Sequence, residues 1–205
     1  MRSIAKLMKD WQFTGPNGVP TAVELPHTWN AKDGQDGGND YWRGCCTYCT
    51  RFAAPVYDPA QQQVWLQFEG VNASAAVLLN GQQLCTHDGG YSTFRAEVTE
   101  LLQAENQLTV RVDNSVNDRV YPQKADFTFY GGIYRDVSLL VVNKNHIALG
   151  HFGDTGVKIT PALQENSADI RVETLVEGSG TVTVELLDAE GRTAAKGEGE
   201  NTFLH

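Results

Sequence analysis

Hydrophobic and polar residues alternate along much of the chain. Every second residue is apolar in the segments 64–69, 108–113 and 181–186, and the segment 170–177 follows the same pattern with one interruption at Leu175. A period of two, with β-branched residues on one side, is typical of a half-buried antiparallel strand. Units in which a strand alternates with a helix are absent. The pattern therefore predicts an all-β protein and argues against a parallel sheet.

Two local signals refine this prediction. The dipeptide Asn80-Gly81 separates the runs 75–79 and 82–85, and it predicts a tight hairpin because such a turn needs positive φ at both central residues. The segment 98–103 is the one helix-like stretch, with a turn or two at most. For the first part of the chain we expect a β-sandwich of the jelly-roll type.

The composition changes near residue 145. All four tryptophans lie within the first 65 residues, and the net charge is −3 over residues 1–145 but −6 over residues 146–205. The second region predicts about four strands, whereas an immunoglobulin-like sandwich needs about seven. We therefore expect a jelly-roll domain at 1–144 and a partial immunoglobulin-like β-sandwich at 145–205, truncated within a longer protein.

Charge and hydropathy exclude several classes of partner. The formal net charge of −9 repels phosphate backbones and anionic lipid, so neither nucleic acid nor a membrane surface is expected as a partner. No apolar run approaches the ~20 residues of a membrane helix. The N-terminal residues lack the apolar core of a signal peptide, which predicts a cytoplasmic protein.

The four cysteines indicate a reducing compartment, because three of them crowd at Cys45, Cys46 and Cys49 and form no spaced disulfide framework. A zinc site using Cys46, Cys49 and Cys85 is conceivable. On a strand, however, Cys46 and Cys49 point to opposite faces, so small buried thiols are the favoured interpretation. We expect no metal and no cofactor.

Two long loops, 26–44 and 113–132, are the places where chemistry would lie, since connections beyond ~12–15 residues are uncommon without a functional reason. Both mix carboxylates, amides and aromatic rings beside glycines. That mixture suits a sugar, whose ring stacks on an aromatic side chain while carboxylates accept hydrogen bonds from its hydroxyls. The alternative is that the rings cap the sandwich and the acids are solvated. The acids of the first loop do not have the spacing of a Ca²⁺-binding loop.

A set of short motifs occurs in a fixed order along the chain. Together they resemble the N-terminal sugar-binding domain of glycoside hydrolase family 2, the family of β-galactosidases and β-glucuronidases, over about residues 10–142. Residues 145–205 resemble the start of the immunoglobulin-like domain that follows in that family. The motifs are LPHTWN (25–30), YWRG (41–44), FEGV (68–71), LNG (79–81), HDGGYSTF (87–94), VTELL (98–102), VDN (112–114) and DFTFYGGIYRDV (126–137).

The resemblance implies that catalysis and substrate contact come from different domains of the parent protein. In this family a separate (β/α)₈ barrel carries two catalytic glutamates, the acid/base within an Asn-Glu dipeptide, and hydrolyses β-glycosides with retention. No Asn-Glu dipeptide occurs here, so the chain is expected to hold no catalytic residue and to be inactive alone. By resemblance, Asp126 contacts a substrate hydroxyl in the barrel's active site, and Asn39, Asp40 and Tyr41 are weaker candidates for a second contact.

Three interpretations follow. The leading one is the non-catalytic portion of a β-galactosidase-like enzyme of carbohydrate metabolism, or of a β-glucuronidase-type parent, with the catalytic barrel and a terminal β-linked sugar as partners. The second is a free-standing carbohydrate-binding module on the same jelly roll. The third is a structural domain that forms subunit contacts in a homo-oligomer. The half-domain after residue 145 favours the first, because a free module has no use for a partial sandwich.

Overall fold

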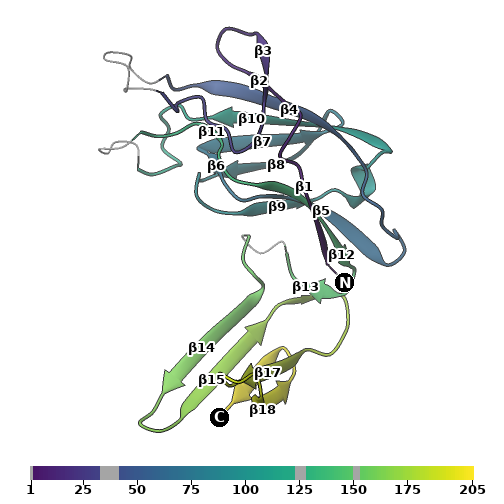
Figure 1. The fold of residues 1–205 in the computed structure, drawn as a ribbon, viewed down its shortest axis with the longest axis vertical. Coiled ribbons are helices and arrows are strands. Elements are labelled where there is room, and N and C mark those ends of the chain that lie inside the picture. The colour runs from purple at the N-terminus through teal and green to yellow at the C-terminus, as the bar shows by residue number, and fades with distance from the viewer. Residues whose placement is uncertain (1, 33–41, 123–127, 150–152) are drawn as a thin grey trace. The chain divides into compact units, whose positions relative to one another are not determined.

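The computed structural model describes residues 2–32, 42–122, 128–149 and 153–205 (Figure 1). The chain divides into two compact units, Met1–Val141 and Val142–His205. The described residues form antiparallel strands and one short 3₁₀ helix, which confirms the all-β prediction. No helix in the described ranges is long and apolar enough to cross a membrane.

The first unit is a sandwich of two main sheets, with a small third sheet that pairs β11 (Gly132–Ile133) with β6 (Val71–Asn72). The four-stranded sheet has the order β1 (Ser3–Lys6), β12 (Val137–Asn143), β5 (Gln62–Phe68) and β9 (Phe94–Glu97). The six-stranded sheet has the order β3 (Pro20–Val23), β2 (Trp11–Thr14), β4 (Cys45–Ala53), β10 (Glu105–Asp113), β7 (Ser74–Leu79) and β8 (Gln82–Asp88).

The hydrophobic core lies between the two main sheets. On β4 and β10 burial alternates residue by residue, so Tyr48 and Leu108 point inward. They pack in one buried cluster with Leu66 of β5 and Leu139 of β12 in the opposite sheet. Each fully buried side chain of this size contributes about 1.5–3 kcal/mol of burial free energy. On these two strands, the alternation of residues in the sequence therefore determines which side chains enter the core.

The predicted hairpin is present between β7 and β8. Asn80 has φ 52° and Gly81 has φ 84°, as a tight turn of this kind requires. The side chain of Asn80 also accepts a hydrogen bond from the backbone N–H of Gln107 at 2.9 Å and donates one to the Leu101 carbonyl at 3.0 Å. The 3₁₀ helix, Thr99–Leu101, lies where the short helical stretch was predicted.

The cysteines behave as the strand prediction requires. All four are free. Cys46 faces the core, whereas Cys49 lies on the opposite, outer face of β4. Burial raises the pKa of the Cys46 thiol to about 12, so it stays protonated and is a poor metal ligand.

The second unit contains small sheets. A three-stranded sheet joins β14 (Val157–Leu163), β15 (Ala168–Thr174) and β19 (Asn201–Leu204), and two-stranded sheets join β13 (His146–Ile147) to β16 (Val176–Glu177) and β17 (Thr183–Leu187) to β18 (Thr193–Glu198). The sequence pattern did not predict β13 or β19. On β14, Ile159 and Leu163 are 64% and 84% exposed. The assignment of residues 145–205 to a truncated immunoglobulin-like domain, separate from 1–144, stays a prediction.

Candidate functional site

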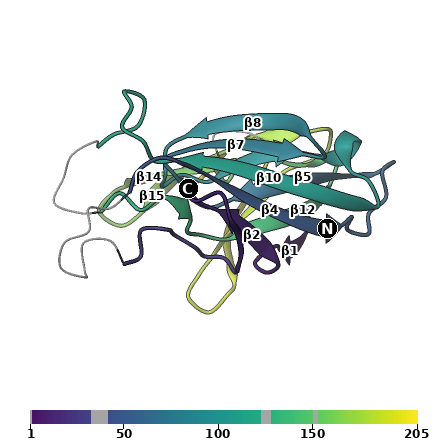
Figure 2. The same ribbon diagram turned by 90° about the horizontal axis from the view of Figure 1, so that it is seen from above.

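The described parts of the two long loops lie at the same end of the first sandwich, beside β6 and β11 (Figure 1), and the turned view in Figure 2 agrees that they share one end. Their described parts are joined by hydrogen bonds over long sequence distances. Thr28 donates its hydroxyl hydrogen to the Gly131 carbonyl at 2.8 Å, and the backbone N–H of His27 donates to the Ile133 carbonyl at 2.8 Å. This end of the sandwich is therefore the candidate site.

Asn30, 1% exposed, ties the first loop to itself and to the second loop. Its Nδ2 donates to the Trp42 carbonyl at 2.8 Å, which closes the first loop. Its Oδ1 accepts a hydrogen bond from the backbone N–H of Gly131 at 2.7 Å. The same Oδ1 accepts from Nδ2 of Asn114 at 3.1 Å. We call Asn30 and Asn114 the asparagine clamp.

Asn114 completes the clamp from the end of β10. It is fully buried; its Oδ1 accepts from the backbone N–H of Gly44 at 2.8 Å, and its Nδ2 donates to the Phe129 carbonyl at 3.0 Å. Its own backbone carbonyl accepts from Nε of Arg43 at 2.7 Å. Buried amides are stable only when such partners are present. The clamp therefore fixes both loops through main-chain atoms.

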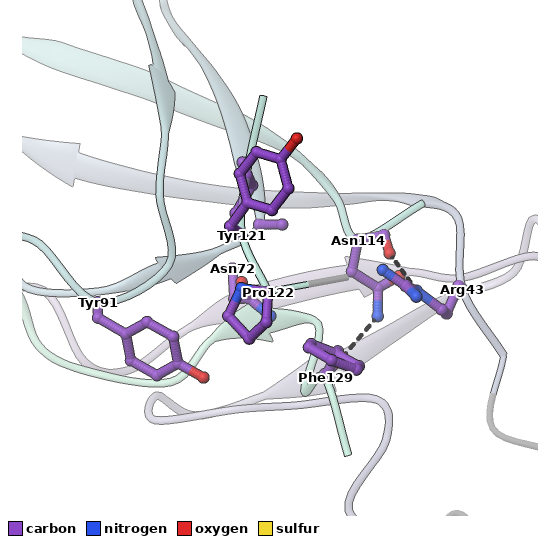
Figure 3. A pocket seen from close by; sticks show the side chains of 9 residues that line it. Arg43, Asn72, Tyr91, Asn114, Tyr121, Pro122 and Phe129 are labelled. Carbon is purple, nitrogen blue, oxygen red and sulfur yellow. Dashed lines mark hydrogen bonds between the residues drawn. The ribbon is translucent and has the colours of Figure 1, made fainter. Parts of the chain in front are cut away.

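Arg43 lies over the ring of Phe129, with its Cζ 5.0 Å from the ring centroid (Figure 3). Between these residues and Asn72, Tyr91 and Pro122 is a cavity of about 10 Å³. That volume holds about one water molecule, so it is too small for a sugar. Arg43 is a structural cation here, since its Nε is used by a backbone carbonyl.

Two glycines let the backbone of the second loop approach the first. Gly132 has φ 139°, and a Cβ there would lie 2.4 Å from the His27 carbonyl oxygen. A Cβ at Gly131 would lie 2.0 Å from Cζ2 of Trp29. The Gly-Gly pair in the motif 126–137 is thus required by close packing.

The histidines near the site have structural roles. Nδ1 of His27 lies 2.7 Å from the hydroxyl of the fully buried Tyr48. Burial lowers the pKa of His27 and raises that of Tyr48, so both stay neutral near pH 7. His87 uses Nε2 toward the Gly89 carbonyl at 3.0 Å, and burial lowers its pKa as well.

An exposed salt bridge also joins the second loop to β8. Nε of Arg119 lies 3.0 Å from Oδ2 of Asp88, whose Oδ1 accepts the hydroxyl hydrogen of Ser74 at 2.5 Å. The bond from Ser74, more than the arginine, lowers the pKa of Asp88. An exposed pair of this kind adds little stability.

A shallow groove of about 290 Å³ opens at the same end of the sandwich. Its lining residues are Thr28, Asn72, Tyr91, Tyr130 and Tyr134. Tyr91 and Tyr134 lie outside the two loops that the sequence singled out. Asn72 also lies outside those loops, and its Nδ2 donates to the Tyr130 carbonyl at 2.8 Å.

The substrate contacts predicted at Asn39, Asp40, Tyr41 and Asp126 lie outside the described residues, so their roles stay predictions. The sequence argument missed the asparagine clamp. The signal was present, because both amides occur in the quoted motifs, but nothing local shows that residues 84 positions apart share a hydrogen bond.

Comparison with known proteins identifies the class. The family model described as the glycosyl hydrolase 2 galactose-binding domain-like family matches residues 38–162. The chain is 37% identical to a putative β-glucuronidase of Formosa agariphila over 84% of the chain and 21% of that protein. It is 32% identical to a β-glucuronidase of Bacteroides fragilis over 97% of the chain and 30% of that protein.

Solved structures of named glycosidases also match this chain. An FMN-binding β-glucuronidase from Faecalibacterium prausnitzii L2-6 matches with a TM-score of 0.93 and 34% identity, over all of this chain and 33% of that one. A putative β-galactosidase from Bacteroides fragilis matches with a TM-score of 0.88 and 33% identity, over 98% of this chain and 33% of that one.

The fold and these matches together define a galactose-binding-like β-sandwich domain. The chain belongs to the glycosyl hydrolase 2 galactose-binding domain-like family, as the resemblance predicted. It spans about a fifth to a third of the length of these relatives.

Proposed function

We propose that this chain is the non-catalytic, substrate-contacting portion of a family 2 glycoside hydrolase that cleaves β-glycosides with retention. The family match over residues 38–162 is the observation that carries the proposal. The clamped loops support it, because they give the sandwich a fixed end from which side chains reach a substrate. The two carboxylates of a retaining mechanism, about 5–5.5 Å apart, would come from a catalytic barrel outside this chain.

The favoured substrate is a β-linked glucuronide. The two curated relatives described above and the F. prausnitzii structure are named as β-glucuronidases or a putative one. A β-galactoside is the second candidate: it agrees with the sequence argument and is favoured by the 33% identity to the putative β-galactosidase of B. fragilis. A cytoplasmic location and self-association of the parent remain part of the proposal.

Within the site, Asp126 is proposed to accept a hydrogen bond from a hydroxyl of the terminal sugar, and Asn39, Asp40 and Tyr41 to supply a second contact. Bonds to an ionised acceptor are roughly twice as strong as neutral ones. The described residues beside these segments support the assignment. The asparagine clamp holds the carbonyls of Trp42 and Phe129.

A chimera tests the parent activity. In it, residues 1–205 replace the matching segment of the B. fragilis β-glucuronidase, and p-nitrophenyl β-glucuronide and β-galactoside are the substrates. We expect the chimera to hydrolyse the glucuronide and the isolated 205-residue chain to hydrolyse neither. Turnover by the isolated chain, or a folded chimera inactive on both substrates, contradicts the proposal.

The same chimera tests Asp126. Asp126→Ala should lower kcat/KM by about 10- to 100-fold, the loss expected for one charged hydrogen bond, with an unchanged Tm. Asp118→Ala is the matched control, because Asp118 is an exposed acid in the same loop. Equal kcat/KM for Asp126→Ala and the parent chimera would remove Asp126 from the site.

A further inference from the structure

The groove formed by Tyr91, Tyr130, Tyr134, Thr28 and Asn72 is a second candidate binding site. We propose that this tyrosine groove binds a neutral sugar ring, as a subsite separate from the contacts proposed for Asn39, Asp40, Tyr41 and Asp126. The inference rests on the proposed function, since it assumes a carbohydrate substrate, and it adds a second saccharide position to it.

Tyr130 and Tyr134 come from one segment and Tyr91 from another, and contacts within the sandwich hold Tyr91 and Tyr134 in place. The hydroxyl of Tyr134 donates to the Gly90 carbonyl, and the Tyr91 ring meets the Tyr134 ring edge-on with centroids 6.3 Å apart. Nη1 of Arg135 donates to the Tyr91 carbonyl at 3.0 Å. A site prepared in this way loses little conformational entropy when a ligand binds.

The groove offers aromatic faces to solvent. Tyr91 and Tyr130 are 59% and 43% exposed, although large apolar surfaces are usually covered in a folded domain. Tyrosine has an apolar ring and a polar tip. A pyranose has the matching character, with an apolar C–H face and hydroxyls around its rim. The volume of about 290 Å³ lies near the lower limit of ligand pockets, roughly 300–1,000 Å³.

Hydrogen-bonding groups remain available at the edge of the groove. Among the described residues, the hydroxyls of Tyr91 and Tyr130 have no hydrogen-bond partner. Asn72 is 5% exposed and uses its Nδ2 on the Tyr130 carbonyl, while its Oδ1 has no partner in the described ranges. Two donor–acceptor hydroxyls and one carbonyl acceptor suit a polyol, because sugar hydroxyls both donate and accept.

The charge of the groove selects a neutral ligand. None of the five lining residues carries a charge near neutral pH. Burial raises the pKa of Tyr134 to about 12, so its hydroxyl remains a donor. The Arg135 guanidinium lies against the Tyr134 ring, with its Cζ 5.7 Å from the ring centroid, and its Nη1 donates to the backbone carbonyls of Tyr91 and Glu69. A carboxylate placed in the groove would lose hydration, and none of the five lining side chains could form an ion pair with it.

Titration of the 205-residue chain with defined sugars tests the site. The probes are methyl β-D-galactopyranoside, methyl β-D-glucopyranoside and methyl β-D-glucuronide, followed by NMR of tyrosine side chains labelled with ¹³C. We expect saturable shifts of Tyr91, Tyr130 and Tyr134 with the neutral sugars, at a Kd on the order of millimolar. The glucuronide should bind at least about 10-fold more weakly.

Variants identify the site. Tyr91→Ala should weaken binding at least about 10-fold, and Tyr91→Phe, which keeps the ring, should weaken it only a few-fold. Tyr121→Ala is the matched control, because Tyr121 is 76% exposed and shares the small cavity of Figure 3 with Tyr91 but does not line the groove. It should leave binding unchanged. Tyr91 is largely exposed, so its variants should fold.

Absence of saturable shifts, equal or tighter binding of the glucuronide, or equal loss in Tyr121→Ala overturns the proposal. With no saturable shifts, the exposed rings would be a contact face for another part of the glycosidase. The result of the sugar titration is independent of the result of the chimera assay. A chimera that hydrolyses glycosides while the isolated chain binds no neutral sugar retains the proposed function and rejects the tyrosine groove.

Discussion

The side chain of Asn114 uses both of its polar atoms on partners from two loops. Asn114→Ala leaves the Gly44 N–H and the Phe129 carbonyl without these bonds, and buried polar groups left unpaired cost about 1–3 kcal/mol each. We expect a loss of about 2–4 kcal/mol in the free energy of unfolding, measured by urea denaturation. Asn17→Ala, at an exposed turn, should cost less than about 1 kcal/mol. Equal losses would refute the clamp.

His27 predicts a pH dependence of stability. Burial lowers its pKa in the native state, whereas the unfolded chain titrates near the ordinary value of about 6.5. Between these two pKa values the unfolded state binds more protons, so stability falls as the pH is lowered from 7.5 to 5. In the protonated ring Nδ1 carries a hydrogen, so it can only donate toward the hydroxyl of Tyr48.

Urea denaturation at several pH values measures this effect. His27→Gln should flatten the fall in the free energy of unfolding between pH 7.5 and 5, with the remaining slope from His87, whose pKa is lowered in the same direction. If the free energy of unfolding falls equally steeply with pH in His27→Gln and in the parent chain, His27 does not control the pH dependence of stability.

At the scale of elements, the turn between β7 and β8 depends on Gly81. A Cβ at this position meets no atom within 4 Å, so Gly81→Ala tests backbone conformation alone. With φ at 84°, alanine should destabilise the domain by about 1–2 kcal/mol. Gly81→Asn should cost less, because asparagine tolerates positive φ. Thermal unfolding of the two variants measures the difference, and a larger loss for asparagine would contradict the argument.

The elements that the sequence predicted are those whose signal is local. The alternation in 64–69 and 108–113 marks strands β5 and β10, and Asn80-Gly81 marks the hairpin. Strand β11 has two residues and follows from pairing with β6, so it leaves no period to detect. The asparagine clamp and the tyrosine groove depend on folding that joins distant residues. Sequence spacing does not encode them.

At the scale of the whole molecule, the two units differ in how much apolar surface they cover. In the first, large side chains such as Trp11, Tyr48 and Phe68 are completely buried, whereas in the second Ile159 and Leu163 of β14 remain exposed. Hydrogen exchange follows local stability. We expect the amides of β14 and β15 to exchange faster than those of β4 and β10, in the 205-residue chain followed by mass spectrometry. Uniform slow exchange across both units would contradict an incomplete second sandwich.

The asparagine clamp grips its loops by their backbones. Its amides reach the N–H groups of Gly44 and Gly131 and the carbonyls of Trp42 and Phe129. Any amino acid supplies a carbonyl, and any except proline supplies an N–H. Side chains between these anchor points can therefore change during evolution while the hydrogen bonds that fix the loop backbones are kept.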